Sequence, residues 1–205
     1  MKIVLTGSEE SRQALKKTNE NIDWIEVEST KDFNDHINAD AFFNLNNDAA
    51  AQVYSPELKL IFINSVIIPL KDIEQNKNLI RFNGWNGFLQ RDIWEVSGNI
   101  HAAAEKIFRE TGKKFTAVAD EPGFISARIL AMIINEAYFA RGENVSTETE
   151  IDIAMKLGTN YPKGPFEWAE LIGKQNILLL LNRLTQSDLS YTPAPLLVKE
   201  SAITS

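Results

Sequence analysis

The chain of 205 residues contains no cysteine and only two histidines, His36 and His101. Without cysteine there can be no disulfide bond, no thiolate zinc ligand and no cysteine nucleophile, and the absence fits a reducing compartment. The two histidines lie far apart in the sequence, and no cluster of carboxylates surrounds either of them. We therefore expect no metal site.

Basic charge and long apolar runs are scarce as well. The chain has 21 Lys and Arg residues against 28 Asp and Glu residues, which gives a formal net charge of -7. Because binding to a phosphate backbone requires clustered Lys and Arg, we do not expect a nucleic-acid partner. No segment reaches the ~18 apolar residues of a membrane helix, and the N-terminal apolar run is too short for a signal peptide. These features predict a cytoplasmic protein without a membrane partner.

The first half of the chain alternates short β-type runs with polar or helical stretches. Strands that are almost continuously apolar and are separated by longer connections favour a parallel sheet covered on both faces. The segment 8–20 predicts a helix after the first strand, with Ser8 as its N-cap. The strand candidates are 2–6, 24–28, 41–45, 58–64, 79–83 and 91–96.

The pattern changes near residue 99 and becomes almost entirely helical. A helix over 99–112 and a last strand over 113–118 lead into the second half. We predict a domain division into residues 1–118 and 119–205. The last fifteen or so residues are expected to form a packed extended tail or a frayed end. The helices predicted in the second half are 122–142, 147–158, 164–173 and 174–186.

Three blocks of the second half carry a resemblance to a known family: "DEPGFISARILAMIINEA" (120–137), "TEIDIAMKLGTNYPKGPFEWAELIG" (149–173) and "YTPAPLL" (191–197). They resemble the 3-hydroxyacyl-CoA dehydrogenases, the 3-hydroxybutyryl-CoA dehydrogenases among them. The resemblance implies an α/β fold in which a compact Rossmann-like parallel sheet precedes an all-helical C-terminal domain. It also implies an NAD cofactor, an acyl-CoA ligand and a homodimer formed through the C-terminal helices. The chain would be a shortened and divergent member.

In the family a histidine acts as the base and a glutamate twelve residues later holds it. Aligning "DIWEV" with the family strand puts Glu95 at the glutamate position and Asn83 at the histidine position. An amide has no pKa near neutrality, so it can hydrogen-bond a hydroxyl but cannot accept its proton. Asn86 matches a substrate-side asparagine of the family, and Asn64 and Ser65 match the end of its serine-rich strand. Ala127 stands where the family has a second substrate-side asparagine.

The cofactor loop departs from the family pattern in a similar way. The Rossmann fingerprint requires three glycines, but "TGSEESR" retains only Gly7, with Glu9 and Arg12 in the other two places. Glu9 would bring negative charge to the position of two phosphates. Glu28 suits the ribose hydroxyls of a dinucleotide. NAD is therefore a possible but doubtful cofactor, because Glu9 and the loss of two fingerprint glycines disfavour tight binding.

Simpler interpretations of the same residues remain open. Glu95 could pair with Arg81 or Arg91, Asn83 and Asn86 could be ordinary turn residues, and His101 could replace the missing base. We predict a protein of fatty acyl-CoA metabolism with a degenerate active site, which keeps acyl-CoA binding or a dimer role and has impaired or lost hydride transfer. The alternatives are an active NAD-dependent 3-hydroxyacyl-CoA dehydrogenase and a non-catalytic dimerisation module.

Overall fold

The computed structural model describes residues 1–16, 21–47, 49–74 and 78–202. The chain folds into two compact units, Met1–Phe124 and Ile125–Ser205. The division lies after residue 124, whereas the sequence placed a domain boundary after residue 118.

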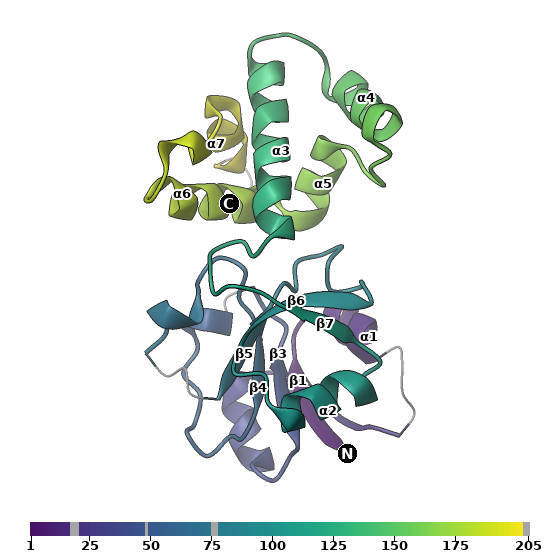
Figure 1. The fold of residues 1–205 in the computed structure, drawn as a ribbon, viewed down its shortest axis with the longest axis vertical. Coiled ribbons are helices and arrows are strands. Elements are labelled where there is room, and N and C mark those ends of the chain that lie inside the picture. Colours follow the sequence, from purple (N-terminus) through teal and green to yellow (C-terminus); the bar gives the residue numbers. More distant parts are fainter. Residues whose placement is uncertain (17–20, 48, 75–77, 203–205) are drawn as a thin grey trace. The chain divides into compact units, whose positions relative to one another are not determined.

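The first unit is built on one mixed sheet, which has seven strands among the described residues (Figure 1). The first five strands in sequence run parallel, β6 pairs antiparallel with β5, and β7 runs parallel to β6. This confirms the predicted α/β fold with a mostly parallel sheet, although its last two strands are reversed. In the order β2-β1-β3-β4-β5-β6-β7, the strands are β1 Lys2–Thr6, β2 Asp23–Glu26, β3 Ala41–Asn44, β4 Ile61–Asn64, β5 Leu79–Phe82, β6 Ile93–Gly98 and β7 Lys114–Ala117.

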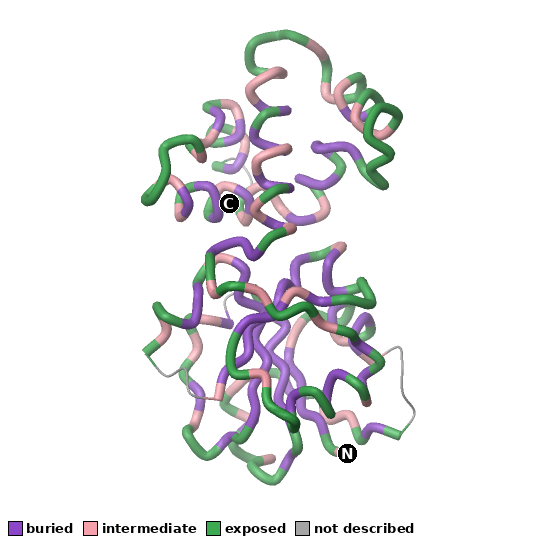
Figure 2. Tube along the Cα trace, in the orientation of Figure 1, coloured by how far each residue is buried: buried purple, intermediate pink, exposed green. Residues whose placement is uncertain are grey.

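Both faces of the sheet are covered, because the central strands are apolar on both sides. Helices α1 (Glu9–Lys16) and α2 (Ala102–Glu110) pack on one face, where Phe43 stacks on Phe62 at 4.4 Å and Phe82 stacks on Trp94 at 4.6 Å between ring centroids. On the other face the described residues form short 3-10 helices: η1 Thr30–His36, η2 Ala49–Ala51 and η3 Leu70–Asp72. Strands β3, β4 and β5 are accordingly buried along their whole length, whereas the edge strands β2 and β7 are not (Figure 2).

The second unit is helical. Its longest helix, α3, contacts each of the other α-helices described in the unit. The expectation of an extended or frayed tail was wrong for residues 195–201, which form a helix that begins at a proline and packs on α3 and α6. No helix in the described part of the chain is long and apolar enough to cross a membrane. The helices are α3 Ser126–Gly142, α4 Glu148–Thr159, α5 Pro165–Ile172, α6 Lys174–Thr185, η4 Leu189–Tyr191 and α7 Pro195–Ser201.

Two buried polar side chains connect the elements of the second unit. The Asn135 amide donates to the Thr192 carbonyl at 2.9 Å and accepts from the Ala194 N–H at 2.8 Å. This contact holds the segment that enters α7. Asp152 accepts from the first N–H groups of α5, at 2.8 Å from Phe166 and 3.2 Å from Glu167. Each side chain therefore satisfies one buried backbone N–H, that of Ala194 and that of Phe166, together with a part-buried backbone group.

A buried arginine in β5 anchors the last segment of the first unit. The Arg81 side chain is fully buried, and it donates to Asp120 Oδ1 at 3.0 Å and to the Glu121 carbonyl at 2.8 Å. Its guanidinium also lies 4.0 Å from the centre of the Phe124 ring. Burial lowers the pKa of Arg81 to about 10, which leaves it charged at neutral pH.

The carboxylate of Asp120 has further partners, because it also accepts from the backbone N–H groups of Leu70 and Lys71 at 3.0 Å each. Replacing Asp120 by alanine would leave the buried charge of Arg81 without its partner. We expect Asp120→Ala to lower the free energy of unfolding by about 3–5 kcal/mol. Urea denaturation followed by tryptophan fluorescence measures this loss.

The neighbouring Glu121→Gln variant is the matched control. The Glu121 carboxylate pairs with Lys71, and both side chains are about half exposed. Removing such a pair should cost less than about 1 kcal/mol. Equal losses in the two variants would contradict the assignment of the anchor to Asp120.

Candidate functional site

The carboxyl end of β5 brings two of the predicted site residues together. Asn83 follows β5 directly, and its backbone N–H donates to the Glu95 carbonyl of β6 at 3.2 Å. The Asn83 side chain is buried, and its Nδ2 donates to Glu95 Oε2 at 3.4 Å. Asn83 Oδ1 is also buried and has no hydrogen-bond partner among the described residues. Because the amide donor faces the carboxylate, the atom left available at Asn83 is an acceptor.

Arg81 and Arg91 were the two possible charge partners of Glu95, and in the structure Glu95 interacts electrostatically with Arg91. Burial lowers the pKa of Arg91, and the nearby Glu95 carboxylate opposes that shift. Arg81 instead pairs with Asp120. Glu95 itself is half-buried. The Glu95 carboxylate therefore accepts from the Asn83 amide and lies close enough to Arg91 for their charges to interact.

Asn64 holds the loop that carries Asn83. Its Nδ2 donates to the Leu45 carbonyl at 3.2 Å and to Asn47 Oδ1 at 2.8 Å, and its Oδ1 accepts from the Gly84 N–H at 3.0 Å. A Cβ at Gly84 would lie 2.7 Å from Asn64 Cγ, so only glycine fits this approach. The amide of Asn64 is thus engaged within the chain, and its predicted contact with a substrate stays a prediction.

The two remaining substrate-side candidates differ in exposure. Ser65 is buried, and its hydroxyl donates to the Ile68 carbonyl at 2.6 Å. Asn86 is exposed and lies in the turn where the Phe88 N–H donates to the Trp85 carbonyl at 2.8 Å. The structure therefore places Asn64, Asn83 and Glu95 in one hydrogen-bonded region, with Ser65 directly after β4 and Asn86 on the surface of the β5–β6 loop.

A buried lysine that the sequence did not point to supports the same loop. Lys113 donates from Nζ to the carbonyls of Leu89 and Arg91 at 3.1 and 2.9 Å, and Nζ lies 5.1 Å from the ring centre of Trp94. The indole N–H of Trp94 donates to the Leu89 carbonyl at 3.1 Å. The sequence around Lys113 does not indicate this role, because Lys113 lies just before β7 and its partner Leu89 is more than twenty positions away.

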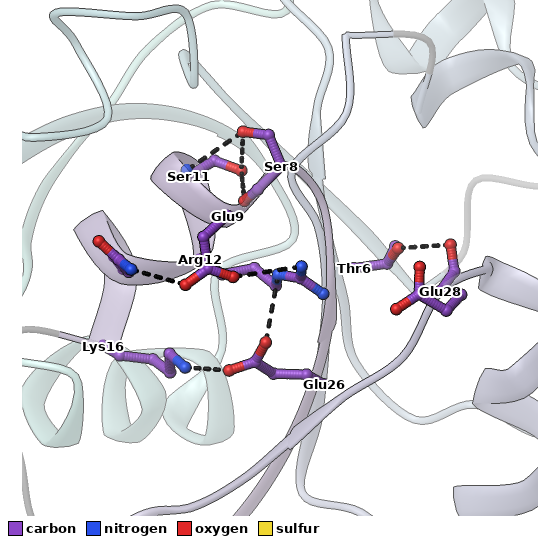
Figure 3. Close-up of polar contacts among 9 residues, drawn as sticks. Thr6, Ser8, Glu9, Ser11, Arg12, Lys16, Glu26 and Glu28 are labelled. Atoms are coloured by element: carbon purple, nitrogen blue, oxygen red, sulfur yellow. Dashed lines mark hydrogen bonds and ion pairs between the residues drawn. The ribbon is translucent and has the colours of Figure 1, made fainter.

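The loop between β1 and α1 is the second candidate region (Figure 3). Gly7 has a φ of +151°, and a Cβ there would lie 2.7 Å from Leu45 Cβ and 2.8 Å from Ser11 Oγ. Ser8 is the N-cap that the sequence predicted, because its Oγ accepts from the Ser11 N–H at 3.2 Å. One N–H donor of the helix N-terminus is therefore satisfied within the chain.

Charged side chains connect this loop to the end of β2. Arg12 lies between two carboxylates, with its Nη2 at 3.4 Å from Glu9 Oε2 and its Nε at 3.2 Å from Glu26 Oε2 (Figure 3). Lys16 also pairs with Glu26, and the hydrogen bond from Lys16 lowers the pKa of the Glu26 carboxyl. Glu28 lies beyond β2 and is exposed, and its backbone carbonyl accepts from Thr6 Oγ1 at 3.2 Å.

These residues do not fit the pyrophosphate of a dinucleotide. In open sheets of this order, ligands bind at the carboxyl ends of the strands where the strand order reverses, which is between β1 and β3 here. At that point Gly7 already packs against Leu45. Glu9 adds a carboxylate at the first position of α1, the helix end at which a phosphate would bind. Among the residues described, no three His, Asp or Glu side chains are grouped so that they could hold a metal ion.

Comparisons with known proteins agree with the fold and with the sequence blocks. Residues 123–201 match the family model of the 3-hydroxyacyl-CoA dehydrogenase C-terminal domain. Over 99 residues the chain is 41% identical to the 3-hydroxyadipyl-CoA dehydrogenase of Escherichia coli and 40% identical to the 3-hydroxybutyryl-CoA dehydrogenase of Bradyrhizobium diazoefficiens. Each alignment covers 47% of this chain, but only 21% and 34% of those relatives.

A longer match and a solved structure extend the similarity beyond the helical unit. The chain is 30% identical over 165 residues to a probable 3-hydroxyacyl-CoA dehydrogenase of Caenorhabditis elegans, covering 73% of this chain and 52% of that protein. The fold is similar to the crystal structure of (S)-3-hydroxybutyryl-CoA dehydrogenase from Ralstonia eutropha, with a TM-score of 0.73 at 19% identity. That match covers 99% of this chain and 94% of the solved chain.

The close approach of Gly84 to Asn64 leads to a test of the loop. We expect Gly84→Ala to lower the free energy of unfolding by about 1–3 kcal/mol, because the added methyl group would overlap both Asn64 and the Phe82 ring. Gly158→Ala is the control, since Gly158 lies in α4 with nothing within 4 Å of the added Cβ. There alanine should raise stability by about 0.5–1 kcal/mol through its better helix propensity. Thermal unfolding of both variants gives the comparison, and a stabilised Gly84→Ala protein would contradict the assigned contact.

Proposed function

Because the chain belongs to the 3-hydroxyacyl-CoA dehydrogenase family, we propose that it binds an acyl-CoA thioester and has lost NAD-dependent hydride transfer. Its role would lie in fatty acyl-CoA metabolism, as a binding protein rather than as an oxidoreductase. The observation that carries this proposal is the contact between Asn83 and Glu95. The sequence resemblance assigns these two residues to the positions of the family's base and of the carboxylate that holds it.

An amide in place of the base changes what this pair can do. A carboxylate next to an imidazole orients the ring and stabilises the cation that forms when the ring takes a proton. The Asn83 amide takes up no proton, so Glu95 can only orient it, through the 3.4 Å contact from Nδ2. Asn83 Oδ1 then has capacity to accept a hydrogen bond from a ligand hydroxyl. The Asn83 side chain therefore supports binding, and it cannot itself remove the hydroxyl proton.

The cofactor side supports the same conclusion. A pyrophosphate at the start of α1 would lie near the negative charge of Glu9, which opposes its binding. Because the Glu9 side chain is 63% exposed and pairs with Arg12, solvent and the guanidinium reduce this repulsion, and the loss of two fingerprint glycines is the stronger reason against NAD binding. We therefore propose that NAD is not a functional cofactor of this chain. Gly7 and Glu28 match positions of the family's cofactor site but do not bind the cofactor by themselves.

Two other functions each have an observation in their favour. An active dehydrogenase is favoured by the presence of Glu95 at the carboxyl end of the sheet, in a fold that is similar to those of active enzymes. A dimerisation module is favoured by exposed apolar side chains on the helical unit, among them Ile129, Leu179 and Val198 at 53, 45 and 44% exposure. We propose that the chain forms a homodimer through its C-terminal helices in either case, and that it is cytoplasmic.

A pair of ligands separates these functions in a thermal-shift assay. We expect acetoacetyl-CoA to stabilise the protein, by about 2.7 kcal/mol when its concentration is a hundred times Kd, and NADH to give no stabilisation at millimolar concentration. Saturable oxidation of NADH in the presence of acetoacetyl-CoA would instead establish the active enzyme. If neither ligand stabilises a protein that sediments as a dimer, the dimerisation module is the remaining function.

Variants at position 83 connect the ligand to the proposed site. We expect Asn83→Ala to weaken binding of 3-hydroxybutyryl-CoA, whose hydroxyl can donate to Asn83 Oδ1, by about tenfold, the effect of losing one buried hydrogen bond. Asn99→Ala, which changes an exposed asparagine after β6, should leave the affinity unchanged. Isothermal titration calorimetry measures both constants. Equal affinities would place the ligand away from Asn83.

A further inference from the structure

The loop between β5 and β6 contains two Asn-Gly pairs, Asn83–Gly84 and Asn86–Gly87. An asparagine followed by glycine is chemically labile, since glycine has no Cβ to shield its backbone nitrogen from the preceding side-chain carbonyl. Two copies of one labile dipeptide, three residues apart, would react at the same rate in an unstructured peptide. The fold holds them in different environments.

The first pair is held on both sides. The Asn83 side chain is only 2% exposed, and its Nδ2 faces Glu95. The Gly84 nitrogen donates its proton to buried Asn64 Oδ1 at 3.0 Å. Neither the amide carbon nor the attacking nitrogen can move toward the other without breaking these contacts.

The second pair lies at the surface. Asn86 is exposed, and no hydrogen bond engages its amide within the part of the chain that the structure describes. Gly87 is half-buried with a φ of +88°. Its N–H donates to Gln90 Oε1 at 2.9 Å, and Gln90 is itself exposed, so this contact competes directly with water.

We propose that Asn86 is a site of spontaneous covalent modification, which converts it into aspartate and isoaspartate while Asn83 is protected. The Gly87 nitrogen loses its proton to water and forms a bond to Asn86 Cγ, and the side-chain nitrogen leaves as ammonia. Water then opens the resulting succinimide ring. Cleavage of the bond from Cγ to nitrogen gives aspartate, and cleavage at the backbone carbonyl gives isoaspartate.

Either product changes the loop. Aspartate adds a negative charge at position 86, and isoaspartate inserts a methylene group into the main chain inside the turn closed by Phe88 and Trp85. If the loop binds an acyl-CoA, which rests on the proposed function, modification would lower that affinity as the protein ages. The modification itself needs no ligand, so it can be tested independently of the proposed function.

Peptide mapping tests the site with an internal control. The folded protein is incubated at neutral pH and physiological temperature for several weeks and then digested with trypsin. Cleavage after Arg81 and Arg91 gives one peptide, 82–91, which carries both asparagines. Fragment ions locate the exchange of NH2 for OH at each of them. We expect Asn86 to convert at least about tenfold faster than Asn83, because buried segments react through rare local opening.

Two further samples make the result decisive. In guanidinium chloride the two rates should become equal within about threefold, since the contacts that protect Asn83 are lost with the fold. Asn86→Gln should abolish the fast conversion while circular dichroism stays unchanged, because the longer side chain closes the ring poorly. Equal rates in the folded protein, or a stable Asn86 in folded protein whose asparagines both react in denaturant, would overturn the proposal.

Discussion

The side-chain amide of Asn64 is the constraint on which the candidate site depends. It lies at the end of β4 and binds the loop after β3 through Leu45 and Asn47, and the loop after β5 through the Gly84 N–H. These three contacts lie at the carboxyl edge of the sheet, where parallel folds place their ligands. Because Gly84 has no side chain, the loop can approach this amide closely, and Asn83 is thereby directed toward Glu95. The same contact protects the Asn83–Gly84 pair.

Polar side chains in both candidate regions take part in contacts within the chain. At the carboxyl ends of β4 and β5, the donor of Asn83 faces Glu95 and the hydroxyl of Ser65 donates to a backbone carbonyl. At the start of α1, Arg12 bridges the carboxylates of Glu9 and Glu26. A ligand that needed the same atoms would have to break these contacts, whereas Asn83 Oδ1 has no partner among the described residues.

The predicted strands and helices largely agree with the structure, because apolar runs and capping residues act locally. Ser8 is predicted as an N-cap and a helix is predicted over 147–158, and in the structure Ser8 caps α1 while Thr147 and Glu150 form a capping box at the start of α4. The final helix was missed: it begins at Pro195, and a proline is well tolerated at the first position of a helix. The Asn135 contacts that hold the entry to α7 join residues 57 and 59 positions apart, which no local pattern reveals.

Residue identities alone establish which chemical groups the chain offers: an asparagine at the position that the resemblance assigns to the base, a glutamate twelve residues later, and one glycine of a three-glycine fingerprint. An asparagine side chain accepts no proton near neutral pH in any fold, so this property did not require a structure. Which of these groups take part in contacts depends on the tertiary fold. Arg81 was a candidate partner for Glu95, yet it pairs with Asp120, because burial of β5 directs its side chain to the segment that closes the first unit. Asn64 protects the Asn83–Gly84 pair through its hydrogen bond with the Gly84 N–H. Asn64 lies twenty residues before Gly84 in the sequence, so only folding brings the two groups within hydrogen-bonding distance.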